Sequence, residues 1–280
     1  MMRTRVLSAI VMLIITLTCI LLSPVTRVLF FAAVGILCAY ELSVNLEKLN
    51  IRCTLWVMIT YLVAQALLTV LDAGLFAYSV CFIAGVYLAL LSGILRNTVS
   101  GNGALDTVAG LAYPCSLFSA LMVIGTSDIW FETFVLAMLS TWICDTFAML
   151  GGMRFGKHKL APAVSPNKTW EGTICGAVSS VFTGILVWGL GLLCADLPWL
   201  GGLYSPLPLA VCVVTAVLAS SLGQIGDLAE SLIKRMIGVK DFSNLIPGHG
   251  GMFDRADSLL FAIPTAYFCI RVASMIMKGM

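Results

Sequence analysis

The sequence predicts an all-α protein with about nine membrane-spanning helices, and three observations support this class. Of the 280 residues, 60% are hydrophobic and only 11% are charged, and the mean hydropathy is +1.03. The apolar residues form long runs, and the basic residues gather in alternate gaps between them. A soluble domain has roughly half apolar and a quarter charged residues. Because folding in water would leave large apolar surfaces uncovered, a soluble protein is excluded.

Nine apolar runs approach the length of about 20 residues that a helix needs to cross a bilayer. We expect helices at 6–22, 28–46, 55–70, 76–95, 104–124, 134–151, 172–195, 207–228 and 256–277. The third run is short and the fifth contains Pro114, so eight or ten spans are the alternatives. We expect a single membrane domain, 1–280, in which 1–130 forms a scaffold and 131–280 carries the reactive helices and cytoplasmic loops.

Lysine and arginine predict the orientation of these spans. With a cytoplasmic N-terminus, 13 of the 16 basic residues fall on the inner side, and only Arg27, Arg271 and Lys278 do not. Cytoplasmic loops carry this excess of positive charge in membrane proteins. Eight or ten spans would break the alternation, so the sequence predicts nine spans, with the N-terminus inside and the C-terminus outside.

The first polar segment begins inside the sixth run, at Asp145. A carboxylate at bilayer depth usually faces a cavity and has a partner, and a structural hydrogen bond to a neighbouring helix is an equal alternative. Lys157 and Lys168 follow, while Ser165 and Thr169 are typical of a turn and a helix N-terminus. A helix N-terminus beside a lysine suits a phosphate group, although the lysines could instead anchor the loop to anionic headgroups.

The second polar segment carries two pairs of acids. Asp227 and Glu230 are three residues apart, so a helix would place them on one face. Asp254 and Asp257 repeat this spacing where the last run begins. Carboxylate oxygens are the hard ligands that Mg²⁺ prefers, together with phosphate oxygens. We therefore expect a magnesium site here, with weak surface ion pairs as the alternative.

Basic residues and a glycine-rich turn lie between and beside these acids. They are Lys234, Arg235, Lys240, His249, Gly250, Gly251 and Arg255. Lysine and arginine balance the charge of a polyphosphate, and glycine allows close approach of the backbone to a ligand. For His249 we expect a contact with substrate, with metal ligation or a turn as alternatives. Because phosphoryl and nucleotidyl transfer need alignment and charge neutralisation, the segment predicts such chemistry on the cytoplasmic side.

This second segment resembles the signature of the phosphatidate cytidylyltransferases, also called CDP-diacylglycerol synthases. The matching residues are Ser231, Lys234, Arg235, Lys240, Asp241, Ile246, Pro247, His249, Gly250, Gly251, Met252, Asp254, Arg255 and Asp257. The stretches FGKHKLAP and SPNKTWEG in the first segment are similar to the same family. The family often has Tyr and Arg at the positions of Met149 and Met153.

The resemblance implies transfer of CMP from CTP to phosphatidate, which gives CDP-diacylglycerol and pyrophosphate in phospholipid biosynthesis. Asp227 and Asp254 would hold the principal Mg²⁺, and Asp257 and Asp145 would be further ligands or orienting groups; a second cation is left open. Lys234 and Arg255 would act in catalysis beside Asp227 and Asp254. The substrate-binding residues would be Lys157, Ser165, Lys168, Thr169, Arg235, Lys240, His249, Gly250 and Gly251.

The expected partners are CTP, phosphatidate and the lipid bilayer, without nucleic acid, and a homodimer is left open. We expect a multi-pass protein of the inner (plasma) membrane, with its active site facing the cytoplasm. Two other functions are alternatives. A CTP-dependent lipid kinase would need a base for its hydroxyl nucleophile, and a transporter would use the acids for ion coupling. Transporters often contain repeated halves, and the sequence shows no convincing repeat.

Overall fold

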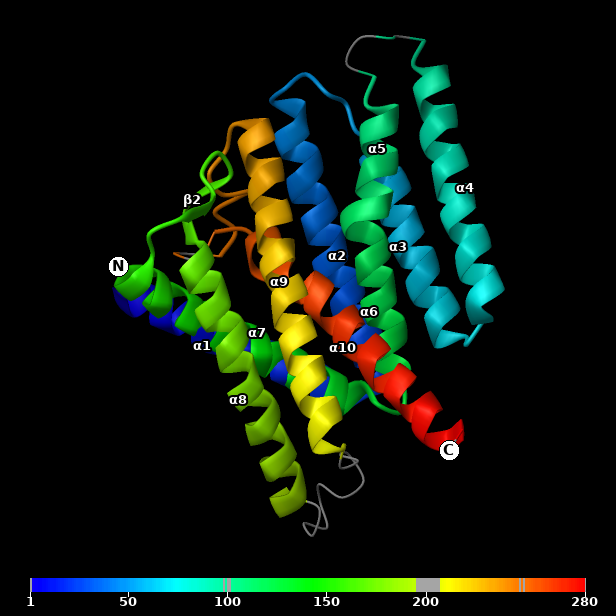
Figure 1. Cartoon of the computed structure of the whole chain (residues 1–280). Helices are drawn as coiled ribbons and strands as arrows, with labels where there is room; N and C mark the ends of the chain where they lie inside the picture. The colour runs from blue at the N-terminus through cyan, green and yellow to red at the C-terminus, as the bar shows by residue number, and fades with distance from the viewer. Residues whose placement is uncertain are drawn as a thin grey trace. The chain divides into compact units, whose positions relative to one another are not determined.

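The chain forms two compact units in the computed structural model, which describes residues 2–97, 99, 102–194, 207–246, 248 and 250–279 (Figure 1). The first unit is Met1–Thr126 with Lys234–Ala256, and the second unit is Ser127–Ile233 with Asp257–Met280. Helices α9 (Leu209–Ile237) and α10 (Phe253–Gly279) contain the points where the chain passes from one unit to the other.

The first unit is helical wherever the first five apolar runs predict a helix. Its elements are α1 (Met2–Leu22), α2 (Pro24–Glu47), α3 (Leu55–Val70), α4 (Gly74–Leu95), α5 (Ala104–Gly110), the π-helical turn η1 (Leu111–Cys115) and α6 (Ser116–Thr126). Its core includes Val28, Cys38, Val57, Leu62 and Phe118, each at most 1% exposed. The close approach of α2 and α6 depends on Gly35, where an added Cβ would lie 3.0 Å from the Phe118 ring.

A capping box starts α2. The Ser23 hydroxyl accepts a hydrogen bond from the Thr26 N–H (3.1 Å), and the Thr26 hydroxyl accepts one from the Ser23 N–H (3.0 Å). Pro24 occupies the first helical position, where its missing N–H costs nothing. The helix therefore begins four residues earlier than the apolar run at 28–46 indicates.

Pro114 bends the fifth span without dividing it. Tyr113 leaves the helical region, at φ −149° and ψ 118°, and the helix resumes at Ser116. Proline lacks the N–H for the helical ladder and its ring collides with the preceding turn. The stretch from Ala104 to Thr126 nevertheless keeps the length and hydropathy of one span.

The second unit contains α7 (Trp130–Phe155), the strands β1 (Lys159–Ala161) and β2 (Ser165–Thr169), α8 (Trp170–Cys194) and parts of α9 and α10. The two strands form an antiparallel hairpin in which Lys159 pairs with Thr169. This hairpin corrects the all-α prediction locally, because only a turn and a helix N-terminus were expected around Ser165 and Thr169.

Glycines and cysteine bring α7 and α8 together as an antiparallel pair. An added Cβ would lie 2.5 Å from Cys175 at Gly151, 2.5 Å from the Ala148 carbonyl at Gly172 and 2.8 Å from the Cys144 sulfur at Gly176. Small residues allow this close packing between membrane helices. Leu136, Val187, Cys212, Ala216 and Ile270 then form a buried core among α7, α8, α9 and α10.

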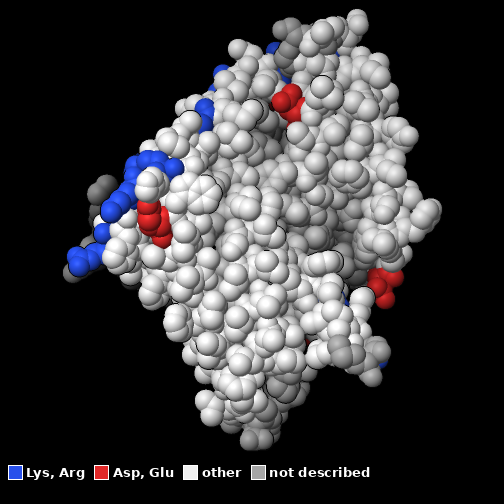
Figure 2. Space-filling view, viewed as in Figure 1, with Lys and Arg blue, Asp and Glu red and all other residues white. Residues whose placement is uncertain are grey.

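The described helices have the properties of membrane spans. Seven are long and apolar enough to cross a membrane, and two shorter apolar helices are Leu7–Leu22 and Leu55–Val70. Phe76 is 83% exposed and Phe182 is 68% exposed, which suits a side chain facing lipid better than water. Figure 2 shows a face whose visible atoms are almost all uncharged, with Lys, Arg, Asp and Glu in small patches. The chain is therefore a multi-pass membrane protein.

Candidate active site

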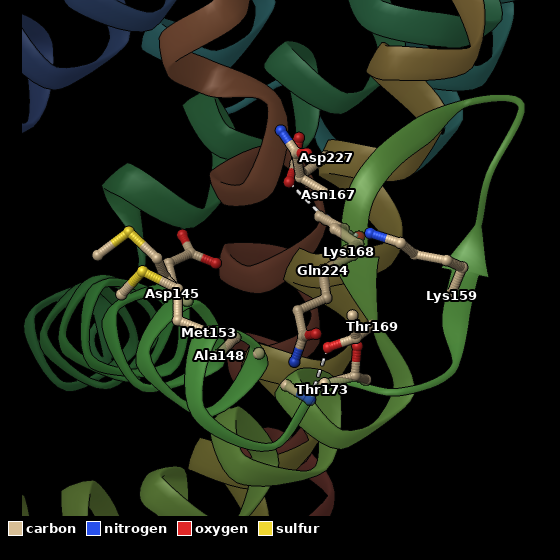
Figure 3. Close-up of a pocket in the computed structure, with 14 residues that line it drawn as sticks. Asp145, Ala148, Met153, Lys159, Asn167, Lys168, Thr169, Thr173, Gln224 and Asp227 are labelled. Atoms are coloured by element: carbon tan, nitrogen blue, oxygen red, sulfur yellow. Dashed lines mark hydrogen bonds and ion pairs between the residues drawn. The ribbon is translucent and has the colours of Figure 1, made fainter.

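A pocket of about 530 Å³ with both charged and apolar lining residues lies in the second unit, between the hairpin and the ends of α7 and α8, with α9 on a further side (Figure 3). Its lining residues are Asp145, Ala148, Met149, Gly152, Met153, Gly156, Lys159, Asn167, Lys168, Thr169, Gly172, Thr173, Gln224 and Asp227. A cavity of this size, with acids, lysines, hydroxyls and amides, can hold a polar ligand that carries negative charge.

Lys168 and Asp227 form an ion pair in the wall of this pocket. The Lys168 Nζ lies 2.5 Å from an Asp227 oxygen and donates to the Gln224 carbonyl at 3.4 Å. Lys168 comes from β2, whereas Gln224 and Asp227 are three residues apart on one face of α9. The hairpin thus places the Lys168 ammonium beside the Asp227 carboxylate of α9.

Two hydrogen-bonded side chains fix the hairpin against α8. The Thr169 hydroxyl accepts the Gly172 N–H at 3.1 Å, as an N-cap residue does. The Glu171 carboxylate accepts N–H groups from Lys157 (3.1 Å) and His158 (3.2 Å) and lies 2.6 Å from the His158 Nδ1. His158 therefore pairs with Glu171 and not with a residue of the pocket lining. The exposed Lys157 contributes its backbone N–H to this contact.

Three carboxylates gather where α9 meets α10 in the second unit. Asp227, Glu230 and Asp257 each offer one oxygen, and these oxygens all lie within 4.8 Å of one another. We call these residues the acidic cluster. Glu230 is fully buried, whereas Asp227 and Asp257 are half-buried. Gly226 permits the approach, because an added Cβ there would lie 2.6 Å from the Asp257 carbonyl.

The acidic cluster has the donor set of a hard divalent cation. Mg²⁺ takes oxygen ligands, commonly one or two protein carboxylates, and completes its shell with water and phosphate oxygens. Asp227 belongs to both the cluster and the pocket, so a cation there would face the space that Lys168 borders. Asp145 lines this pocket from α7, and Figure 3 shows its carboxylate turned toward the pocket.

Asp254 lies in the first unit and is bonded to that unit. One of its oxygens lies 2.8 Å from the Lys234 Nζ, and the other accepts the N–H groups of Gly251 (2.8 Å) and Phe242 (3.1 Å). Both ends of the ion pair are nearly buried, with side-chain exposures of 12% for Lys234 and 4% for Asp254. Asp254 thus organises the turn before α10.

The other expected site residues of the first unit are mostly at its surface. Arg235, Lys240 and Arg255 are exposed, and Arg235 donates to the Val239 carbonyl at 3.3 Å. Gly250 has φ +84°, which a side chain would strain. His249 lies outside the described residues. In the second unit, Ser165 pairs with Ala161 in the hairpin and does not belong to the described pocket lining.

Sequence reasoning paired Glu230 with Asp227 without naming it as a metal ligand, and it assigned no site role to Gln224, Asn167 or Lys159. Glu230 had a usable signal, since its spacing from Asp227 places both on one helical face. Asn167 lies in the stretch SPNKTWEG, and Gln224 precedes Asp227 by three residues. Met149 and Met153, noted as departures from the resembled family, both line the pocket.

Fold and pocket together define a class: a multi-pass membrane protein with a charged pocket and an acidic cluster suited to phosphate chemistry. A sequence model of the cytidylyltransferase family matches residues 3–273. The chain belongs to the cytidylyltransferase family.

Curated relatives agree with this assignment over nearly the whole chain. A phosphatidate cytidylyltransferase of Brucella abortus biovar 1 (strain 9-941) is 36% identical over 270 residues, which cover 95% of this chain and 92% of the relative. Those of Staphylococcus saprophyticus and Staphylococcus haemolyticus are 31% and 32% identical over 269 residues, with 94% of this chain and 96% of each relative covered.

Proposed function

We propose that the chain is a phosphatidate cytidylyltransferase, which transfers CMP from CTP to phosphatidate and releases pyrophosphate. One observation carries the proposal. Asp227 belongs to both the acidic cluster and the pocket lining, and the Lys168 Nζ lies 2.5 Å from its carboxylate oxygen. An acid cluster can hold a cation and a lysine can bind a phosphate oxygen. Family membership and the names of the relatives favour CTP and phosphatidate as the two substrates.

In the proposed reaction, a phosphate oxygen of phosphatidate attacks the α-phosphorus of CTP. The bond from that phosphorus to the oxygen bridging to the β-phosphate breaks, and pyrophosphate leaves with the electron pair. The attacking phosphate is already anionic near neutral pH, so it needs no strong base. The main barrier is repulsion between two anions, which positioned positive charge lowers.

We propose that Asp227, Glu230 and Asp257 hold Mg²⁺. When bound, the cation would neutralise triphosphate charge and help to align the reacting oxygens. Asp145 would orient this centre, whereas Asp254 would position Lys234 rather than bind the principal cation, because three donors already engage its oxygens. The proposal concerns this one cation.

Lys168 and Lys159 would bind phosphate oxygens inside the pocket, which both residues line. Lys157, Lys234, Arg235, Lys240 and Arg255 would supply further positive charge to the phosphates, and Thr169 would keep the hairpin closed on α8. We also propose nine spans in a bacterial plasma membrane, with the N-terminus and the site on the cytoplasmic side, where CTP is available. The excess of Lys and Arg in alternate loops supports this orientation.

Labelled CTP tests the proposed reaction on the purified full-length protein. With phosphatidate, Mg²⁺ and CTP labelled at the α-phosphate, we expect label in the lipid together with an equal amount of pyrophosphate, and no turnover after chelation by EDTA. A lipid kinase would release labelled CDP and leave the lipid unlabelled. That result, or an absence of CTP consumption, would contradict the proposal.

A further inference from the structure

A carboxylate of α2 holds the turn that leads into α10. Within the first unit, Glu41 accepts hydrogen bonds from the Ser243 hydroxyl (2.5 Å), the Met252 N–H (2.9 Å) and the Phe253 N–H (2.9 Å). Glu41 is only 3% exposed, so these bonds are shielded from water. We call this set of contacts the Glu41 clasp, and we call the described residues 242–246, 248 and 250–252 the signature loop.

The clasp replaces an ordinary helix cap. The first N–H groups of a helix have no partner in the helix, and a Ser, Thr, Asp or Asn at the N-cap usually accepts one of them. Here α10 begins at Phe253 after Gly251 and Met252, which carry no side-chain oxygen. Glu41 accepts these N–H groups from a position 212 residues earlier than Phe253, and its negative charge also suits the helix N-terminus.

A second residue of α2 holds the other end of the signature loop. Asn45 lies one turn after Glu41 and is 1% exposed. Its Nδ2 donates to the Phe242 carbonyl at 2.7 Å and to the Glu41 carbonyl at 2.7 Å, while its Oδ1 accepts from the Lys48 Nζ at 2.7 Å. Helix α2 therefore forms hydrogen bonds with both ends of the signature loop.

Gly251 shows how closely the loop and α2 fit. An added Cβ at Gly251 would lie 2.7 Å from a Glu41 carboxylate oxygen. The Gly251 N–H in turn donates to Asp254, which is bonded to Lys234. Behind the loop, the rings of Phe242 and Phe253 stack with their centres 4.8 Å apart. A displacement at Glu41 would thus reach Asp254 and Lys234 through a short chain of bonded groups.

We propose that Glu41 is a positioning residue, which together with Asn45 holds the signature loop in its substrate-binding form. The inference rests on the proposed function, because it takes Lys234 and Lys240 as binders of CTP phosphates. Glu41 makes no contact with substrate itself. Its role is to order the loop before CTP arrives, so that binding does not have to supply that order.

Hydrogen exchange tests the clasp without reference to activity. In the full-length protein in lipid nanodiscs, we expect peptides covering 242–253 to exchange faster in Glu41→Gln than in the unmodified protein. The Gln amide keeps one acceptor but turns its NH₂ toward N–H donors. Glu47→Gln is the matched control, since Glu47 is an exposed acid on the same helix. Equal exchange in all three proteins would overturn the proposal.

The KM for CTP and the kcat of Glu41 variants distinguish a positioning role of Glu41 from a purely structural one. If the ordered loop falls to about a tenth of the population, the KM for CTP rises about tenfold while kcat at saturating CTP stays within about twofold. Glu41→Asp, which keeps the charge on a shorter stem, should recover part of the affinity, and Asn45→Ala should raise the KM in the same direction. An unchanged KM with a lower fraction of active enzyme would show that Glu41 only stabilises the fold.

The two readouts distinguish this inference from the proposed reaction. If the unmodified protein transfers no label from CTP, the proposed function fails, and faster exchange in Glu41→Gln still establishes the clasp while its link to CTP is overturned. If label is transferred but exchange and KM are unchanged in Glu41→Gln, the inference fails and the proposed function stands. Glu47→Gln must match the unmodified protein in both measurements.

Discussion

At the scale of single residues, Asp227 is the position on which the candidate site depends most. It belongs to the acidic cluster, lines the pocket and forms the ion pair with Lys168. We expect Asp227→Asn to lower turnover by about a thousandfold, because it removes the one carboxylate that belongs to both the acidic cluster and the pocket lining among the described residues. Labelled CTP measures turnover, and Mn²⁺ paramagnetic resonance should show weaker cation binding.

Asp72→Asn provides the control for that substitution. Asp72 lies in the turn after α3 with φ 51°, a conformation that asparagine adopts readily. It should therefore keep normal turnover and normal Mn²⁺ binding. A fully active Asp227→Asn protein would remove Asp227 from the proposed centre.

Substitution of Lys168 should raise the affinity for Mn²⁺ and lower kcat/KM for CTP. Its ammonium lies 2.5 Å from Asp227, where it repels a divalent cation and competes for the same carboxylate. We expect Lys168→Met to bind Mn²⁺ about tenfold more tightly and to lower kcat/KM for CTP about a hundredfold, because a phosphate loses its cation. Lys278→Met, at the exposed end of α10, is the control. Weaker Mn²⁺ binding by Lys168→Met would contradict this account.

At the scale of elements, glycine contacts decide how α7 and α8 pack. At Gly176 an added Cβ would lie 2.8 Å from the Cys144 sulfur, whereas at Gly189 of the same helix it would meet nothing within 4 Å. We expect Gly176→Ala to destabilise the folded protein by about 1–3 kcal/mol through overpacking. Gly189→Ala should be neutral or slightly stabilising, since alanine favours a helix more than glycine does.

Thermal unfolding in detergent compares the two alanine variants directly. Equal melting temperatures would show that Gly176 does not limit the approach of α7 and α8.

Hydropathy predicted the helices well because crossing a bilayer needs a long apolar segment. It predicted their ends poorly where a helix continues past its apolar part. Helix α9 extends to Ile237 and includes Lys234 and Arg235, which are good helix formers despite their charge. The hairpin escaped prediction because its five-residue strand β2 has no apolar alternation, and its pairing depends on a partner strand across a turn.

The site was predictable where local spacing carries the information. Asp227 and Glu230 share a helix face because they are three apart. The approach of Asp257 to α9 was not predictable, because it depends on packing at Gly226 and not on local spacing. Glu41 gave no sequence signal for its partners, which lie 202 to 212 residues later.

At the scale of the whole molecule, two short helices decide the topology. The apolar parts of α1 and α3 are Leu7–Leu22 and Leu55–Val70, and local thinning of the bilayer or snorkelling of flanking side chains can accommodate such lengths. If α3 did not cross, every later loop would change sides, and the hairpin with its lysines would face outward. That arrangement opposes the preference of Lys and Arg for the cytoplasm.

Reporter fusions test the nine-span layout through this dependence on α3. We expect alkaline phosphatase fused after Asp72 or at the C-terminus to be active, because both positions would lie outside, and the enzyme fused after Lys157 to be inactive. Green fluorescent protein, which needs the cytoplasm to fluoresce in this assay, should give the opposite pattern at all three positions. Activity of phosphatase after Lys157 would place the pocket on the outer side, away from CTP, and would contradict both the topology and the cytoplasmic site.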